Sequence, residues 1–269
     1  MLRAPHVGLL ALVLALASCD ACGVRRNPKA VEPKAEPAAE AKPAPKVEAP
    51  AVLEGAVRLA SPEAPSFLPE ELERKVVDHV KRGAWPAECT PPKVADRTPL
   101  RLTDEGKLSG VVVAVSNFKK ASPQRPPRVH DVVIRDCRLT PSLVLAQKGD
   151  RLRVTSEIKY PFMPGYGPPS QLKTLIPGQT YEVELNALGA SPLMCGFTAP
   201  CGRTDVVVLS HTYAAVTDEQ GSFRIDSFPA DEHVKVSAWH PLLTATETEL
   251  QIAAGETKSI ELVVSPLVR

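Results

Sequence analysis

The 269-residue sequence has few aromatic residues and almost no net charge. Phe, Trp and Tyr make up 4% of the residues, and the formal net charge is +1 at pH 7. A surface that binds nucleic acid needs a basic patch, often with aromatic rings on which bases stack. Neither is visible here, so we expect no nucleic-acid partner.

The sequence also lacks the short motifs of common enzyme classes. It contains no G-x-S-x-G, H-E-x-x-H, G-x-x-x-x-G-K-[ST] or G-x-G-x-x-G. The Gly- and Pro-rich stretch 164–170 precedes no predicted helix whose N-terminus would hold a phosphate, so we interpret it as a surface loop. We therefore predict a protein that is not an enzyme, with no cofactor and no metal.

The first 19 residues, MLRAPHVGLLALVLALASC, have the pattern of a secretory signal. The apolar run over 7–17 is too short to span a bilayer comfortably. The residues LASC at 16–19 resemble the bacterial lipoprotein signal, in which the cysteine is acylated and becomes the first residue of the mature chain. The resemblance implies that Cys19 anchors the protein to the inner or the outer membrane of a bacterial cell envelope. The alternative is an ordinary signal peptide whose cysteine is incidental.

Residues 27–51 consist almost entirely of Pro, Ala, Lys and Glu and include no aromatic residue. Such a segment buries too little apolar surface to offset the entropy of ordering. Its lysines and glutamates nearly balance, which favours a solvated spacer over a basic arm. We predict a disordered tether over residues 20–52.

From residue 53 onward, short apolar or alternating runs are separated by turn residues, as is typical of antiparallel β-sandwiches. The expected strands are 53–60, 99–103, 110–117, 130–136, 142–147, 150–157, 179–186, 204–210, 212–218, 221–228, 232–240, 247–254 and 257–264. One helix is expected over 66–83, where apolar residues recur at helical spacing and Gly83 follows the last turn. The fold class is therefore predicted to be mainly β.

The stretch 213–241 resembles the carboxypeptidase regulatory-like module, a small transthyretin-like β-sandwich. In such modules a strand ends in Thr-Asp, a turn with Gly follows, and the next strand opens with an aromatic residue. Here these residues are Thr217, Asp218, Gly221 and Phe223. Asp and Gly suit the turn, while Phe223 and Ile225 alternate toward the core.

Residues 132–157 and 175–197 resemble the plastocyanin-like (cupredoxin-like) sandwich that precedes this module in some bacterial envelope proteins. Copper-binding members have a His-Asn pair after the strand that corresponds to 152–157, and a Cys-x-x-His-Pro-Trp-Met loop. Cys195 matches the cysteine of that loop, but Thr198 stands at the histidine position, and 156–167 contains no histidine. The resemblance therefore implies a sandwich that has lost its copper ligands. A copper-binding or electron-transfer protein that uses Cys195, Met194 and His211 remains the alternative.

Five cysteines remain besides Cys19, and in an oxidising compartment most of them should pair. Cys195 and Cys201 enclose a short loop with Gly196 and Pro200, and we interpret them as a disulfide that replaced the metal loop. Cys89 and Cys137 are then expected to form a second bridge, with Cys22 left over in the tether. The alternative for both pairs is reduced, buried cysteines.

Four large side chains gather in one loop between predicted strands. They are Tyr160, Phe162, Met163 and Tyr166. An apolar loop at the end of a sandwich often contacts ligands or partners, so this loop is a candidate binding surface. The alternative is that these side chains pack back over the open end of the sandwich.

The sequence thus predicts four segments: a lipoprotein signal over 1–19, the tether over 20–52, a cupredoxin-like domain over 53–200 and a carboxypeptidase regulatory-like domain over 201–269. The expected function is a non-enzymatic, lipid-anchored envelope protein that provides binding or structural support. Its partners would be the membrane, through the anchor, and an envelope protein or glycan. Fold resemblance does not specify the ligand or the oligomeric state.

Overall fold

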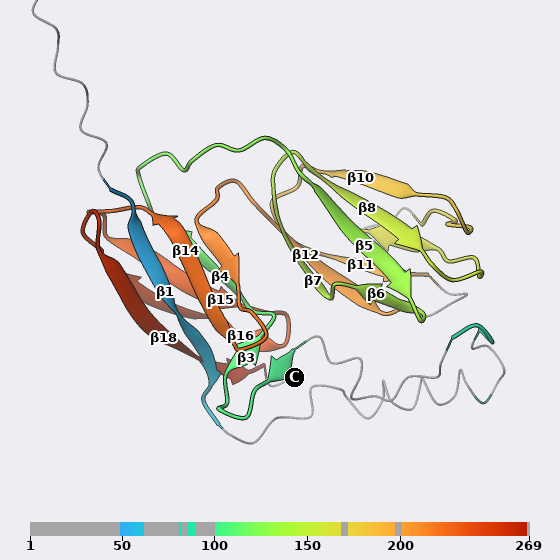
Figure 1. The fold of residues 1–269 in the computed structure, drawn as a ribbon, viewed down its shortest axis with the longest axis horizontal. Coiled ribbons are helices and arrows are strands. Elements are labelled where there is room, and N and C mark those ends of the chain that lie inside the picture. The colour runs from blue at the N-terminus through green and yellow to red at the C-terminus, as the bar shows by residue number, and fades with distance from the viewer. Residues whose placement is uncertain are drawn as a thin grey trace, which may run out of the picture. The chain divides into compact units, whose positions relative to one another are not determined.

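The computed structural model describes residues 49–61, 81, 86–89, 100–167, 172–196 and 201–267. The predicted lipidation site Cys19, the tether before residue 49 and the predicted helix over 66–83, except helical Lys81, lie outside these residues. The described residues are almost entirely β-strand and turn, which confirms the mainly β fold class (Figure 1). No helix within the described residues is long and apolar enough to cross a membrane.

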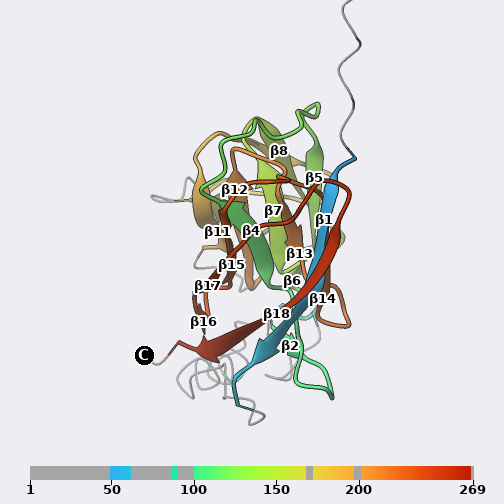
Figure 2. The ribbon, with the colours of Figure 1, turned by 90° about the vertical axis from the view of Figure 1, so that its left-hand side faces the viewer.

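The strands form two β-sandwiches, each with its own hydrophobic core. The first, called the host sandwich, has the sheets β14-β1-β18-β16 and β13-β4-β15-β17 and the small hairpin β2-β3. Its strands are β1 (Ala51–Leu59), β2 (Arg101–Leu102), β3 (Leu108–Ser109), β4 (Val112–Ser116), β13 (Ala214–Val216), β14 (Ser222–Phe228), β15 (Val234–Trp239), β16 (Leu243–Thr244), β17 (Thr246–Leu250) and β18 (Thr257–Pro266). Figure 2 shows β18 beside β1, and their register pairs Val52 with Thr257 through Leu59 with Val264.

The second, called the inserted sandwich, has the sheets β10-β8-β5-β6 and β7-β12-β11-β9. Its strands are β5 (Val129–Arg135), β6 (Arg138–Thr140), β7 (Leu143–Gln147), β8 (Asp150–Ser156), β9 (Pro164–Tyr166), β10 (Tyr181–Leu185), β11 (Gly189–Cys195) and β12 (Arg203–Leu209). All eight strands come from one continuous stretch of chain, 129–209.

The inserted sandwich occupies the position of a hairpin loop in the host sandwich. Strands β4 and β13 are antiparallel neighbours, with Ala114 opposite Ala214. Residues 117–213, which include the whole inserted sandwich, lie between them in the sequence. The two ends of the insert contact the same turn, because Arg151 N–H donates to the Arg128 carbonyl and Lys148 N–H donates to the Leu209 carbonyl, both at 2.8 Å. Adjacent ends are what allow one domain to be inserted into a loop of another.

The predicted boundary between residues 200 and 201 is therefore wrong. Strand β1 lies between β14 and β18, and β4 lies between β13 and β15. A domain built from 201–269 alone would lack the central strand of each of its two sheets. Strand β12, in turn, pairs with β7 and β11 and belongs to the inserted sandwich.

All thirteen predicted strands coincide with observed ones to within a few residues. The structure adds β3, β6, β9, β11 and β16, which the sequence did not predict. Most pairings are antiparallel, as is typical of the expected sandwiches, but β1 with β18, β5 with β8, and β7 with β12 are parallel. Hydrophobic alternation marks a strand but carries no information on the direction of its partner.

The turn between β13 and β14 has the geometry that the sequence predicted. The Asp218 carboxylate accepts the N–H groups of Gln220 and Ser222 at 3.0 and 2.8 Å. Gly221 has a φ of 75°, which glycine adopts without strain. Phe223 and Ile225 are both buried in the host core, so this part of the prediction is confirmed.

Candidate functional site

The cysteine loop between β11 and β12 is the first candidate site, because the family resemblance places a metal there. The structure has both predicted disulfides, Cys195–Cys201 and Cys89–Cys137, with Cα–Cα distances of 5.5 and 5.7 Å. Cys195 ends β11, and Cys201 is fully buried in the core of the inserted sandwich. The Cys201 carbonyl accepts the N–H of Leu139 at 2.8 Å, which fixes the far end of the loop.

The described residues of this loop do not fit a copper ion. A cysteine binds metal as a thiolate, and the sulfur of Cys195 is instead bonded to Cys201. The position of Thr198 lies outside the described residues. Cys195 is therefore held in a covalent bridge and is not free to bind a metal as a thiolate.

The alternative ligand set Cys195, Met194 and His211 is not brought together. Met194 pairs with Arg203 at the start of β12, whereas His211 follows Leu209 at the other end of that strand. At about 3.3 Å per residue, the seven residues of β12 separate them by roughly 20 Å. Among the described residues, no group of three or more His, Cys, Asp and Glu side chains is placed to hold a metal ion. The copper alternative with these ligands was wrong.

The predicted binding loop packs largely inward. Phe162 is 0% exposed and belongs to the core of the inserted sandwich, with Tyr160 edge-on to it at a ring-centroid distance of 5.6 Å. Tyr166 also packs against this core, and burial raises the pKa of its hydroxyl. Phe162 is thus unable to contact a partner, and the packing alternative applies to it. Met163 remains partly exposed.

Two exposed side chains lie beside the cysteine loop, of which Met194 was considered only as a copper ligand and Leu172 was not singled out. Leu172 and Met194 are 37% and 42% exposed. Leu172 lies over Gly196, where an added Cβ would come within 2.7 Å of its Cδ1 atom, and the Gly196 N–H donates to the Met163 carbonyl at 2.8 Å. We call Met163, Leu172 and Met194 the cysteine-loop tip. The sequence signal was weak, because the three residues lie in different segments and no periodic pattern links them.

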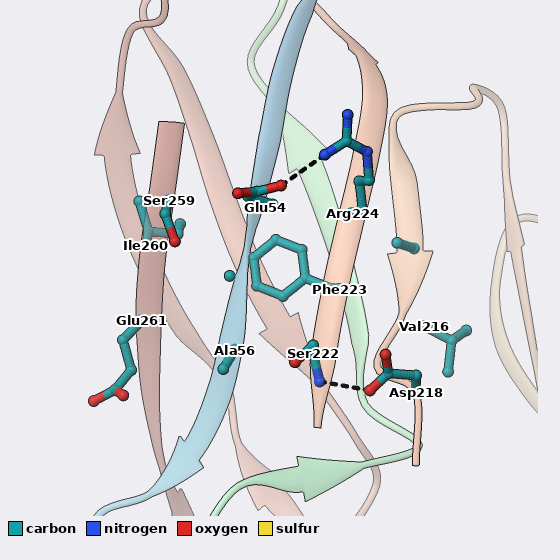
Figure 3. A pocket seen from close by; sticks show the side chains of 12 residues that line it. Glu54, Ala56, Val216, Asp218, Ser222, Phe223, Arg224, Ser259, Ile260 and Glu261 are labelled. Carbon is teal, nitrogen blue, oxygen red and sulfur yellow. Dashed lines mark hydrogen bonds and ion pairs between the residues drawn. The ribbon is translucent and has the colours of Figure 1, made fainter. Parts of the chain in front are cut away.

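A groove of about 730 Å³ on the host sandwich is the second candidate site (Figure 3). Strands β14, β1 and β18 contribute the small residues Ser222, Ala56 and Ser259 to its lining. An ion pair of 2.6 Å joins Arg224 on β14 to Glu54 on β1, and the two side chains extend toward each other in Figure 3. The sequence signal was a glycine inside a strand, Gly55, which often marks a close approach of backbone.

Gly55 is required where it stands. A Cβ at this position would lie 1.8 Å from the carbonyl oxygen of Ile260 on the parallel neighbour β18. On the same strands, Glu261 pairs with Arg58 at 3.2 Å. The lining of the groove includes the carboxylates of Glu54, Asp218 and Glu261 and one guanidinium, that of Arg224, so the groove is acidic. The excess of carboxylates disfavours an anionic ligand.

A polar cluster around Asp150 holds the start of the inserted sandwich. Asp150 is 1% exposed and accepts two hydrogen bonds from the Arg125 guanidinium at 2.8 and 2.5 Å. The N–H groups of Arg128 and Gln147 and the Nε2 atom of His130 each lie 2.8 Å from its carboxylate. Burial alone would raise the pKa of Asp150, but these bonds outweigh burial and hold it far below its ordinary value. These contacts give the cluster a structural role. Its members lie 3 to 25 residues from Asp150 in the sequence, so no local motif identified the cluster.

Comparisons with known proteins give structural neighbours only. No protein-family model matches the sequence, and no curated protein matches it. Among solved structures, amicyanin from Paracoccus versutus is 16% identical, with 36% of this chain and 97% of that chain covered and a TM-score of 0.28. A purple cupredoxin from Nitrosopumilus maritimus is 15% identical, with 29% and 98% covered and a TM-score of 0.26.

A copper-containing nitrite reductase from Thermus scotoductus SA-01 is 15% identical, with a TM-score of 0.27. The match covers 35% of this chain and 24% of the reductase. Because these TM-scores lie below 0.5, the β-sandwich assignment rests on the strand pairings described above.

Proposed function

We propose that this chain is a non-enzymatic, lipid-anchored protein of a bacterial cell envelope whose two β-sandwiches provide binding or structural support. In this proposal Cys19 carries the lipid, and the Pro/Ala/Lys/Glu segment holds the sandwiches away from the membrane. The inserted sandwich is a cupredoxin-like domain that has exchanged its metal for a disulfide. The host sandwich is a carboxypeptidase regulatory-like domain, completed by β1 and β4.

The observation that carries the proposal is the Cys195–Cys201 disulfide. It joins the end of β11 to the start of β12 and uses the sulfur that the family resemblance assigns to copper. A bridge in this position supports a rigid scaffold and opposes electron transfer at this loop. Two disulfides also suit the oxidising conditions outside the cytoplasm.

Two surfaces are available for a partner in this proposal. One is the groove over β14, β1 and β18, whose polar side chains suit the hydroxyl and amide groups of an envelope glycan. The other is the cysteine-loop tip, whose exposed apolar side chains suit a protein.

The proposal is tested by mass spectrometry and metal analysis of the protein isolated from its native envelope without reductant. We expect diacylglycerol on an N-terminal Cys19, linked peptides that contain Cys195 and Cys201, and less than a tenth of an equivalent of copper. A Cys195→Ala, Cys201→Ala double variant is the matched control for the linked peptides. Free thiols at both positions together with one equivalent of bound copper would overturn the scaffold and make the protein a copper carrier.

A further inference from the structure

The two connections between the sandwiches meet at a small cluster of rings. The chain leaves the host sandwich after Ser116 and returns to it at Ala214. Phe118, on the outgoing connection, makes edge-on contacts with His211 and Tyr213 on the returning one, each at a ring-centroid distance of 4.9 Å. We call Phe118, His211 and Tyr213 the connection cluster.

Hydrogen bonds tie the same two connections together around the cluster. The Tyr213 hydroxyl donates to the Ala121 carbonyl at 3.0 Å, and the Thr212 hydroxyl donates to the Pro123 carbonyl at 3.3 Å. Phe118 packs against the host core and Tyr213 is buried in it. The rings therefore fasten both ends of the insertion to one place on the host sandwich.

His211 is the only member of the connection cluster that titrates near neutral pH. Its Nδ1 atom is buried, and no described residue provides that atom with a hydrogen-bond partner. A neutral imidazole tolerates this position with Nδ1 unprotonated and its proton on Nε2. An imidazolium does not, because both nitrogens must then donate, and a buried N–H without an acceptor is costly.

The charged groups on the neighbouring segments do not relieve this cost. Burial and, less strongly, the nearby Glu232 raise the pKa of Tyr213. The two carboxylate oxygens of Glu232 accept the N–H groups of Lys119 and Lys120 at 2.6 and 2.8 Å. The lysine side chains of that segment are cationic and offer no acceptor to a protonated ring. Burial is accordingly what lowers the pKa of His211 below its ordinary value.

We propose that His211 is a pH-operated latch on the insertion. In its neutral form the ring packs in the connection cluster, and in its protonated form it leaves the cluster and frees the outgoing and returning connections from each other. A histidine whose pKa is lower in the closed form stabilises that form fully above the open-form pKa of about 6.5. This stabilisation is lost as the pH falls from about 6.5 toward the closed-form pKa. The open population then rises by up to about tenfold for each pH unit.

The test is amide hydrogen exchange of the full chain at pH 7.5 and pH 5.5, corrected for intrinsic exchange rates. The reporters are the N–H of Val115, which donates to the Tyr213 carbonyl, and those of Lys119 and Lys120. We expect protection at these amides to fall by up to about tenfold at pH 5.5 in the wild-type chain. His211→Phe keeps an aromatic ring that does not protonate, and the part of the pH response that His211 causes should then disappear, so protection should fall less at pH 5.5 than in the wild type.

Two controls keep the test decisive. His233→Asn changes an exposed histidine and should leave the pH response as in the wild type. The buried His240 is present in every variant, so its own contribution cancels in the comparison. An unchanged response in His211→Phe would overturn the latch. So would an NMR titration in which the wild-type His211 ring has a pKa at or above 6.5, and that measurement needs no variant.

Discussion

The two sandwiches reach similar folds in different ways. All strands of the inserted sandwich come from one continuous stretch of chain. It also contains covalent and ionic cross-links, namely two disulfides and the cluster around Asp150. The host sandwich is split by the insertion, and within its described residues no disulfide is present. Its core is a set of close-packed aliphatic and aromatic side chains, with buried His240 and Thr217 as exceptions.

This difference shows what each sandwich depends on. The host sandwich depends on close approach of strands that are distant in sequence, such as β1 and β18. The inserted sandwich depends more on its cross-links, one of which binds Cys89, from the segment before β2, to the turn between β5 and β6. Each sandwich should therefore be sensitive to a different kind of change, and the following predictions rank these changes by size.

The largest effect is expected from Gly55→Ala in the host sandwich. The new methyl group would overlap the Ile260 carbonyl, so β1 and β18 could not keep their register. We expect a loss of more than about 4 kcal/mol in the free energy of unfolding of the host sandwich. The measurement is urea unfolding followed by Trp239 fluorescence in a Trp85→Phe background, since Trp239 ends β15 of the host.

Gly106→Ala is the matched control for this change. Gly106 has a φ of 75° and nothing within 4 Å of an added Cβ, so the substitution should cost only about 1 kcal/mol of backbone strain. Hydrogen exchange should also show that 129–209 stays protected in Gly55→Ala. If that stretch loses protection together with the host, the two sandwiches do not fold independently, and the contrast between them fails.

The next effect is expected from loss of the Cys89–Cys137 disulfide. The bridge closes a long loop, with a sequence separation of 48, and the chain-entropy model gives a stabilisation of about 4 kcal/mol. The Cys195–Cys201 bridge, with a separation of 6, should contribute only about 2 kcal/mol. Urea unfolding of the two Cys→Ala double variants, with exchange of 129–209 as the probe, compares them directly. Equal losses would show that strain or packing at the bridges outweighs loop length.

Acid should destabilise the host sandwich through His240. This histidine is 2% exposed, its Nδ1 atom accepts the Leu242 N–H at 3.2 Å, and burial lowers its pKa to about 4. Because the folded pKa lies below the unfolded value of about 6.5, stability is full above pH 6.5 and falls between pH 6.5 and 4 by about 3 kcal/mol. Asp150, with its strongly lowered pKa, stays ionised in this range and contributes little to the slope.

His240→Phe removes this titration and should flatten the pH dependence of host unfolding between pH 6.5 and 4. The measurement is the urea midpoint from Trp239 fluorescence at several pH values, with His233→Asn as the exposed-histidine control. A slope that persists in His240→Phe would assign the acid sensitivity to another group. The proposed latch at His211 acts locally and should be visible in exchange at Lys119 and Lys120 before the global transition moves.

The sequence predicted the strands well because alternation is a local property. The run QTYEVELN became β10 and GSFRIDSF became β14 close to the expected limits. Strand β11 was missed because Pro192 and Gly189 interrupt its pattern, although its last residue, Cys195, was identified correctly as a disulfide partner. Both disulfides were predicted. Once the short loop had paired Cys195 with Cys201, Cys89 and Cys137 remained to pair with each other.

The sequence did not predict which strands are neighbours. The nearest partners of β1 begin at Ser222 and Thr257, and no pattern within β1 identifies them. The resemblance of 213–241 to a known module suggested a domain that begins near that segment, and its two central strands went unrecognised. The Asp150 cluster and the groove around Gly55 were missed for the same reason, because each is assembled from segments that only tertiary structure brings together.

The insertion at a hairpin loop has a consequence for the order of folding. Joining β4 to β13 across a flexible chain of the length of 117–213 would cost more loop-closure entropy than joining them across about ten residues, by roughly 2 kcal/mol. The inserted sandwich removes most of that cost if it folds first, because its ends at Arg128 and Leu209 already lie at one turn. Strand β1 is synthesised before the insert, so it would stay unpaired until β14 and β18 have been synthesised and pair with it. The inserted sandwich would therefore fold first and act as the folding nucleus of the host sandwich.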